Sequence, residues 1–313
     1  MPTSSHPTRR RFLQSSLAAS ASLLPQLSQA ADPKKKTPLA PMSNPVCVFN
    51  KPLQHLSYEE QASLVAEMGF AGIEGTVRTG GHVEAKNVER DLPKQIAALQ
   101  KHNIEMTLMT TKVNNIDDPL NRTVIKTAAK LGVKRFRMGA YRYDLKKPIP
   151  EQVESFRHTY RELIRYCADL DIQPLYQNHA GAKYFGATLW DLHLLMKGEN
   201  KEQTGICFDI RHATAESGLS WPLLFQLTKP HFKFVYCKDF DWDKKTKRAT
   251  NVPLGTGMVD YPKFFSMLRK INYSDPISLH MEYKDHRDPK LLQESIAAVR
   301  QDHQTLLKFM GKA

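Results

Sequence analysis

Short apolar segments alternate with longer amphipathic segments along this 313-residue chain, and the alternation constrains the fold more than any other feature. The apolar segments have the length of strands, and the segments between them repeat apolar residues at helical spacing. Eight such units in succession, with no low-complexity linker, predict one α/β domain, a (β/α)8 TIM barrel, which needs roughly 250 residues. An open doubly wound sheet is the alternative, but no G-x-G-x-x-G motif opens the first unit.

The expected elements follow directly from these patterns. We expect strands at 46–49, 72–77, 105–109, 135–138, 173–176, 205–210, 234–238 and 277–283. We expect helices at 58–68, 92–101, 121–131, 151–170, 188–196, 221–227, 261–271 and 289–310. Gly69 and Gly132 directly follow two of the helices, as is typical of a helix C-terminus.

The first 45 residues have a different composition. Thr8 to Gln14 reads T-R-R-R-F-L-Q, which matches a twin-arginine export signal, and a small-x-small cleavage site ends at Ala30. The apolar stretch 17–27 between them is too short to span a bilayer, which takes roughly 20 helical residues. We therefore predict a cleaved signal (1–30), a disordered Pro- and Lys-rich leader (31–45), a barrel (46–313), a periplasmic or secreted location, and no stable membrane insertion.

Charge and cysteine usage narrow the function further. Removal of Arg9, Arg10 and Arg11 with the signal lowers the formal net charge from +13 to +10. The basic residues form no stripe interleaved with aromatic residues, so we do not expect a nucleic-acid partner. The four cysteines lie inside apolar segments without a C-x-x-C pair, which favours buried free thiols.

In a (β/α)8 barrel the chemistry lies at the C-terminal ends of the strands. Polar residues at or just after the predicted strands are therefore the candidate site residues. They are Arg78, His82, Tyr141, Gln177, Asn178, His179, Asp209, His212, Tyr236, Lys238 and Glu282.

These strand ends resemble those of the xylose isomerase-like TIM barrels, which include sugar phosphate isomerases/epimerases and family-2 AP endonucleases. That family typically shows E-N-H after strand 5, D-x-x-H after strand 6, H-x-K-D after strand 7, then G-x-G and a final Glu. The corresponding segments here are Q-N-H (177–179), D-I-R-H (209–212), Y-C-K-D (236–239), G-T-G (255–257) and Glu282.

The resemblance implies one divalent metal, whose four ligand positions carry Gln177, Asp209, Tyr236 and Glu282 here. Asp209 and Glu282 match, and Gln177 keeps an oxygen ligand, so Mn²⁺ or Mg²⁺ would suit this set better than Zn²⁺. A metal-free site is the alternative, in which the Lys238 ammonium polarises a sugar oxygen and Tyr236 donates a hydrogen bond.

By the same resemblance, we expect an exported isomerase or epimerase that removes a proton next to the carbonyl of a small carbohydrate. Glu282 would be the base, His179 or His212 the proton carrier, and Lys238 part of the catalytic set. Substrate contacts are expected from Arg78, His82, Tyr141, Asn178 and Tyr236. Export favours free sugars, keto-sugars or keto-glycosides, the last of which could also undergo elimination. A carbohydrate-binding barrel without activity is the main alternative, and an endonuclease is disfavoured.

Overall fold

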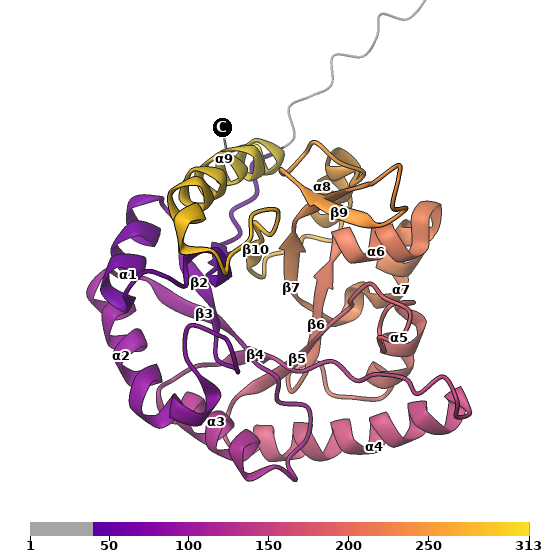
Figure 1. The fold of residues 1–313 in the computed structure, drawn as a ribbon. Coiled ribbons are helices and arrows are strands. Elements are labelled where there is room, and N and C mark those ends of the chain that lie inside the picture. The colour runs from indigo at the N-terminus through magenta and orange to yellow at the C-terminus, as the bar shows by residue number, and fades with distance from the viewer. Residues whose placement is uncertain (1–39, 313) are drawn as a thin grey trace, which may run out of the picture. The chain divides into compact units, whose positions relative to one another are not determined.

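Eight parallel strands form a closed barrel in the computed structural model, which describes residues 40–312 (Figure 1). Around the barrel the strand order is β1-β10-β7-β6-β5-β4-β3-β2, so neighbours in sequence are neighbours in space. The strands are β1 (Val46–Phe49), β2 (Gly72–Thr76), β3 (Glu105–Thr110), β4 (Arg135–Arg137), β5 (Gln173–Gln177), β6 (Gly205–Asp209), β7 (Phe232–Cys237) and β10 (Ile277–Leu279). The predicted (β/α)8 barrel is confirmed.

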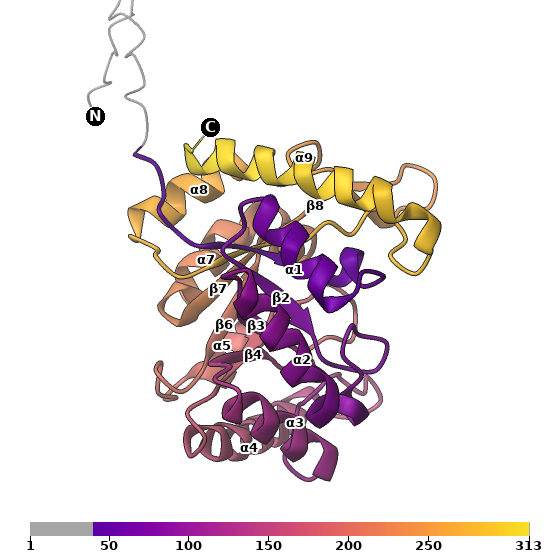
Figure 2. The ribbon, with the colours of Figure 1, turned by 90° about the vertical axis from the view of Figure 1, so that its left-hand side faces the viewer.

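Helices form a ring around the barrel, and local sequence signals define their starts. They are α1 (Tyr58–Glu67), α2 (Val88–Lys101), α3 (Pro119–Lys130), α4 (Ile149–Ala168), α5 (Trp190–Met196), α6 (Ile210–Ser217), α7 (Trp221–Thr228), α8 (Tyr261–Lys270) and α9 (Leu292–Met310). Ser57 and Glu60 form a reciprocal capping box at α1, and Asp118 and Asp260 cap α3 and α8. In Figures 1 and 2 α9 lies beside α8 and completes the ring next to α1.

The core has two parts. The larger part lies between the strands and the apolar faces of the helices. The smaller part fills the inside of the barrel with Cys47, Leu108, Leu175, Cys207, Phe234 and Tyr236. The inward side chains of the strands thus form a packed interior, so substrate access is confined to the barrel ends. All four cysteines are buried and free, as the sequence predicted.

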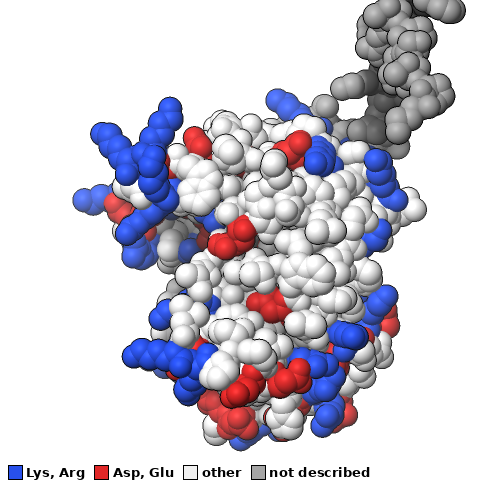
Figure 3. Space-filling model, turned by 90° about the vertical axis from the view of Figure 1, so that its right-hand side faces the viewer, with Lys and Arg blue, Asp and Glu red and all other residues white. Residues whose placement is uncertain are grey.

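The helix α6 and the two strands of a hairpin were not expected from the sequence. The helix α6 begins at Ile210, directly after β6, where the apolar pattern suggested that the strand continued. After β7, β8 (Asp239–Trp242) and β9 (Ala249–Val252) form an antiparallel hairpin. The hairpin's turn carries exposed Lys244, Lys245, Lys247 and Arg248. Figure 3 shows the adjoining side of the molecule, where basic side chains gather at the edges of a largely uncharged surface.

The barrel begins earlier than predicted. Residues 40–45 were assigned to a disordered leader, but Met42 and Asn44 are buried against the barrel. The Met42 N–H donates to the Met310 carbonyl, and the Asn44 amide donates to the carbonyls of Tyr273 and Asp275. The predicted signal lies outside the described residues. Within the described part, no helix is both long and apolar enough to cross a membrane.

Candidate active site

Four strand ends bring their side chains together at the C-terminal end of the barrel. Gln177 ends β5, Asp209 ends β6, Lys238 follows β7 and Glu282 follows β10. The Lys238 ammonium lies between two carboxylates, 3.1 Å from Asp209 Oδ2 and 2.9 Å from Glu282 Oε2. The Gln177 side-chain amide donates to Asp209 Oδ2 at 2.8 Å. The centre of this cluster is therefore a buried cation.

A second lysine holds the other oxygen of Glu282. Lys51, in the short 3-10 turn η1 (Lys51–Leu53) after β1, donates to Glu282 Oε1 at 3.0 Å. Burial would raise the pKa of the Glu282 carboxyl, but Lys238, with His280 and Lys51, holds it well below its usual range. Glu282 is therefore ionised throughout the neutral range. No sequence pattern indicated Lys51, which lies far from Glu282 along the chain.

Asn178 positions the backbone of Asp209. Its side-chain amide donates to the Asp209 carbonyl at 3.0 Å, and its oxygen accepts from the Asp209 N–H at 2.8 Å. Because both polar ends are used and the residue is buried, the expected substrate contact is corrected to a positioning role. Asp209 also caps α6 by accepting from the His212 N–H, which explains why β6 passes directly into a helix.

The rings of His179 and His212 lie against each other, with centroids 4.1 Å apart and planes tilted by 31°. His179 Nδ1 lies 2.9 Å from the Ala180 carbonyl, which only accepts, so Nδ1 carries the proton and Nε2 has a free lone pair. Arg211 donates to His212 Nδ1, so the His212 proton lies on Nε2, 3.4 Å from Asp209 Oδ2. Burial and then Lys238 lower the pKa of His179 to about 4 and that of His212 well below its usual value. Both rings are neutral at pH 7.

A cavity of about 410 Å³ opens beside this cluster. Its lining comes from the ends of β3, β4 and β5 and the loops that follow them, with Arg78 from the loop after β2. The lining residues are Arg78, Thr111, Lys112, Asn114, Arg137, Met138, Gly139, Ala140, Arg142, Tyr176, Gln177, His179 and Tyr184. His179 and Gln177 thus connect the cavity to the Lys238 cluster. Arg137, which the strand-end pattern did not single out, donates to Gln177 Oε1 at 2.6 Å.

Three expected substrate contacts lie elsewhere. His82 packs between α1 and α2, where its ring nitrogens meet the Leu56 carbonyl and the Gln61 amide. Tyr141 is buried in an aromatic cluster and stacks on Phe156, with its hydroxyl on the Asn114 carbonyl. Tyr236 is fully buried inside the barrel. All three predictions are corrected to structural roles because their polar atoms already have protein partners.

Beneath the cluster, Glu74 of β2 organises a buried polar network that the sequence did not reveal. Its carboxylate accepts from Tyr236 at 3.1 Å, Ser278 at 2.8 Å and His280 at 2.7 Å, and also from Thr110. Burial disfavours its charge, but His280 and Arg137 lower the pKa of Glu74 to about 2. Glu74 in turn raises the pKa of the buried His280 above its ordinary value. The Glu74–His280 ion pair is therefore a buried part of the barrel interior below the site.

The motif D-x(15)-G-x-G has a structural explanation. Asp239 accepts four backbone N–H groups, those of Phe240, Gly255, Gly257 and Val259, at 2.8 to 3.2 Å. A Cβ on Gly257 would lie 2.3 Å from the Phe240 carbonyl oxygen and 2.5 Å from Asp239 Oδ1. Asp239 therefore fastens the segment after the hairpin, next to Lys238.

The donor set does not fit the divalent metal that the resemblance implies. A metal needs free carboxylate oxygens, but the Lys238 ammonium bridges Asp209 and Glu282. The Gln177 oxygen is engaged by Arg137, and Tyr236 lies below with its hydroxyl on Glu74. Among residues 40–312 there is no group of three or more His, Cys, Asp and Glu side chains arranged to hold a metal.

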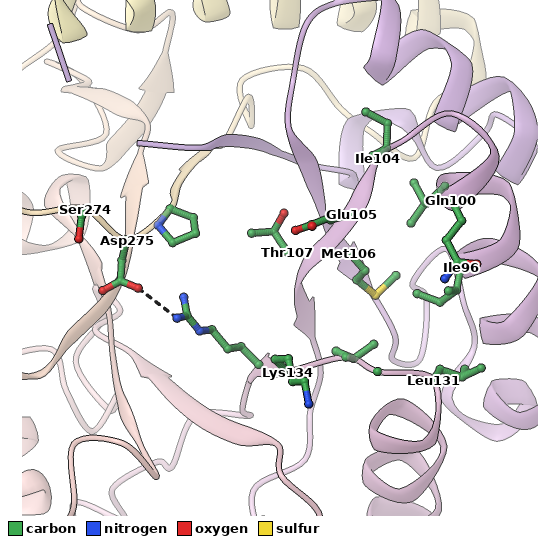
Figure 4. A pocket seen from close by; sticks show the side chains of 15 residues that line it. Ile96, Gln100, Ile104, Glu105, Met106, Thr107, Leu131, Lys134, Ser274 and Asp275 are labelled. Carbon is green, nitrogen blue, oxygen red and sulfur yellow. Dashed lines mark ion pairs between the residues drawn. The ribbon is translucent and has the colours of Figure 1, made fainter. Parts of the chain in front are cut away.

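A larger cavity of about 490 Å³ lies at the opposite end of the barrel. Figure 4 shows Ile104, Glu105, Thr107 and Asp275 around it. These residues stand at the beginnings of β3 and β10, and Arg135 at the beginning of β4 is paired with Asp275 at 3.1 Å. Catalytic residues of (β/α)8 barrels come from the other face, so the smaller cavity is the candidate active site.

Comparisons with known proteins agree with this architecture. The structure resembles D-allulose 3-epimerase from Methylomonas sp. (TM-score 0.64, 16% identity, covering 86% of this chain and 99% of that one). It resembles 3-keto-D-glucoside 4-epimerase from E. coli (TM-score 0.60, 16% identity, 83% and 99%). It also resembles the IolI protein, solved with a zinc atom (TM-score 0.69, 17% identity, 86% and 98%). At these identities the likeness establishes the fold.

A search of curated protein sequences finds no match. The model of the family described as "Xylose isomerase-like TIM barrel" matches residues 62–302, which is most of the chain. That match spans β2 to β10 and includes every candidate residue except Lys51. The chain belongs to the xylose isomerase-like TIM barrel family.

Proposed function

We propose that this protein is a carbohydrate isomerase or epimerase that moves a proton at the carbon next to a carbonyl without a metal. The observation that carries the proposal is the position of Lys238, whose ammonium stands between Asp209 and Glu282 beside the cavity. A fixed positive charge at this place supplies the electrostatic stabilisation that an enediolate oxygen needs. The similar epimerase structures support the general kind of reaction.

The chain's own residues account for each part of such a step. The C–H proton passes to a base, its electron pair forms the enediolate double bond, and the carbonyl oxygen takes up negative charge near Lys238. Glu282 is ionised, and His179 presents an unprotonated Nε2 at the cavity wall. These two groups can remove the proton and return it, on the same or the neighbouring carbon, without an oxidant or reductant.

A binding protein is the second candidate, and one observation favours it. Glu282 is held by two lysines, which reduces its basicity. A barrel with this charge arrangement could retain a carbohydrate without transforming it.

Deuterium exchange separates the two candidates. In D₂O, keto-sugars and keto-glycosides should gain deuterium next to the carbonyl, as followed by NMR, and treatment with EDTA should not change the rate. Glu282→Gln should lower the rate by about 10²–10⁴, the share of a positioned base. Glu67→Gln, an exposed glutamate of α1 paired with Arg300, is the matched control.

Two outcomes would count against the proposal. Loss of exchange on EDTA treatment would show that the metal-free step is wrong. An absence of exchange with every compound, together with unchanged ligand binding in Glu282→Gln, would make the barrel a binding protein.

We further propose that the protein acts outside the cytoplasm. The proposal rests on the twin-arginine pattern in residues 8–14 and the cleavage pattern that ends at Ala30.

A further inference from the structure

The wall of the candidate active-site cavity carries positive charge without acidic residues. Arg78, Lys112, Arg137 and Arg142 line it, and no aspartate or glutamate does. Within residues 40–312, none of these four side chains has a carboxylate within 4.0 Å, whereas the nearby Lys51 and Lys238 are both paired. A concave surface of one sign concentrates ligands of the opposite sign.

Two of the guanidinium groups share an aromatic neighbour and act on each other electrostatically. Arg78 and Arg137 lie over the same Phe49 ring, with Cζ atoms 6.0 and 5.9 Å from its centroid. Arg137 bonds to Gln177, whereas the Arg78 side chain has no hydrogen-bond partner among the described residues. Burial and the neighbouring Arg137 lower the pKa of Arg78 to about 10. Two adjacent guanidiniums repel each other unless an anion lies between or beside them.

A third guanidinium is oriented at the same cavity. Arg142 lies 3.9 Å above the Tyr184 ring, and the opposite neighbour of that ring is His179, at 4.3 Å between centroids. Tyr184 thus links a cation to the histidine that the proposed reaction uses. Glu74 and Glu282 act on Arg78 and Arg137 only from beyond ion-pair distance, and these two carboxylates are already held by His280, Lys238 and Lys51.

We infer that the cavity binds a carbohydrate with an anionic group, a carboxylate or a phosphate, which Arg78 and Arg137 hold while its carbonyl faces His179 and Lys238. The inference rests on the proposed function for the role of the carbonyl, and it adds the substrate class. Guanidinium forks match both anions through paired N–H donors. The cavity volume of about 410 Å³ accommodates a hexose derivative.

Calorimetric titration of the full chain with three compounds tests the inference. The probes are a keto-hexuronate, fructose 6-phosphate and fructose, which differ mainly in the anionic group. At least one anionic probe should bind about tenfold or more tightly than fructose, and the preference should decrease as salt rises. The anion that binds better identifies the group that the cavity recognises.

Arg78→Gln should remove about tenfold of this preference without changing the affinity for fructose. Arg135→Gln, on the same strand as Arg137 but at the opposite end of the barrel, should leave the preference intact. Equal affinity for all three probes, or an unchanged preference in Arg78→Gln, would overturn the inference. Proton exchange is measured separately. Exchange with fructose alone would support the proposed function and contradict the anionic substrate class. Binding of an anionic probe without exchange would support the substrate class and contradict the proposed function.

Discussion

At the scale of single residues, the site is governed by buried charges whose partners lie far apart in sequence. Lys238 pairs with both Asp209 and Glu282 and, as a neighbouring cation, helps to keep His179 neutral. Replacement of Lys238 would leave two buried carboxylates facing each other, which costs stability as well as function. The charge of Lys238 therefore adds to burial in keeping the neighbouring histidines neutral.

Histidine titrations followed by NMR measure this coupling. The pKa of His179 should be about 4, against 6.5 for an ordinary histidine, and Lys238→Met should move it upward because one of the causes is removed. Burial is the larger cause and remains, so the pKa should stay below 6.5. His303 is the matched control, because burial lowers its pKa to about 4 in a different part of the barrel, stacked on Phe70. A shift of His303 alone, or of neither residue, would contradict the coupling.

The lowered pKa of His179 also predicts how the free energy of unfolding changes with pH. In the unfolded chain His179 binds its proton at higher pH than in the folded protein, so the free energy of unfolding should fall as the pH drops from about 6.5 toward 4. In denaturant titrations across this window, His179→Phe should weaken the pH dependence. An equal pH dependence in variant and wild type would show that the pKa of His179 is not lowered in the folded state.

At the scale of elements, apolar periodicity predicted the strands because parallel strands buried on both faces consist of continuous apolar residues. The limits of this signal are visible at β6, whose apolar segment continues into α6 at Ile210, and at β8–β9, whose basic turn resembles a solvated loop. Strand ends likewise indicated Asp209, Lys238 and Glu282. Lys51 and Glu74 escaped prediction, since no local pattern connects a residue on β2 or after β1 with partners that directly follow the last strand.

The four backbone N–H groups that Asp239 accepts predict a local loss of order when this carboxylate is replaced. Asp239→Asn replaces one of the two accepting oxygens by an NH₂ group, so at least one of the four bound N–H groups loses its acceptor, at a cost of about 1–3 kcal/mol. The amides of Gly255, Gly257 and Val259 should exchange faster with solvent. Asp241→Asn on the same strand is the control, because among residues 40–312 that exposed side chain accepts only from the adjacent Trp242 N–H. Equal exchange rates in the two variants would refute the role of Asp239 in holding this segment.

At the scale of the whole molecule, the compartment in which the chain folds must suit its four buried free thiols. Twin-arginine export carries folded proteins, so the barrel would form in the reducing cytoplasm before it reaches an oxidising environment. The four cysteines suit this order, because Cys47 and Cys207 lie inside the barrel and Cys167 and Cys237 are also buried and free. A chain that folded only after export would expose these thiols to oxidation.

Cell fractionation tests this sequence of events. The wild-type protein should be found outside the cytoplasm with its N-terminus near Ala31, and titration of the unfolded protein should detect four free thiols. Replacement of Arg9 and Arg10 by lysine should leave an unprocessed but folded protein in the cytoplasm, because the paired arginines are the feature that the export system reads. Lys34→Gln and Lys35→Gln, outside the signal, should not affect export. Normal processing of the twin-lysine variant would mean that the chain crosses the membrane unfolded by another route, and disulfides in the exported protein would show that folding follows export.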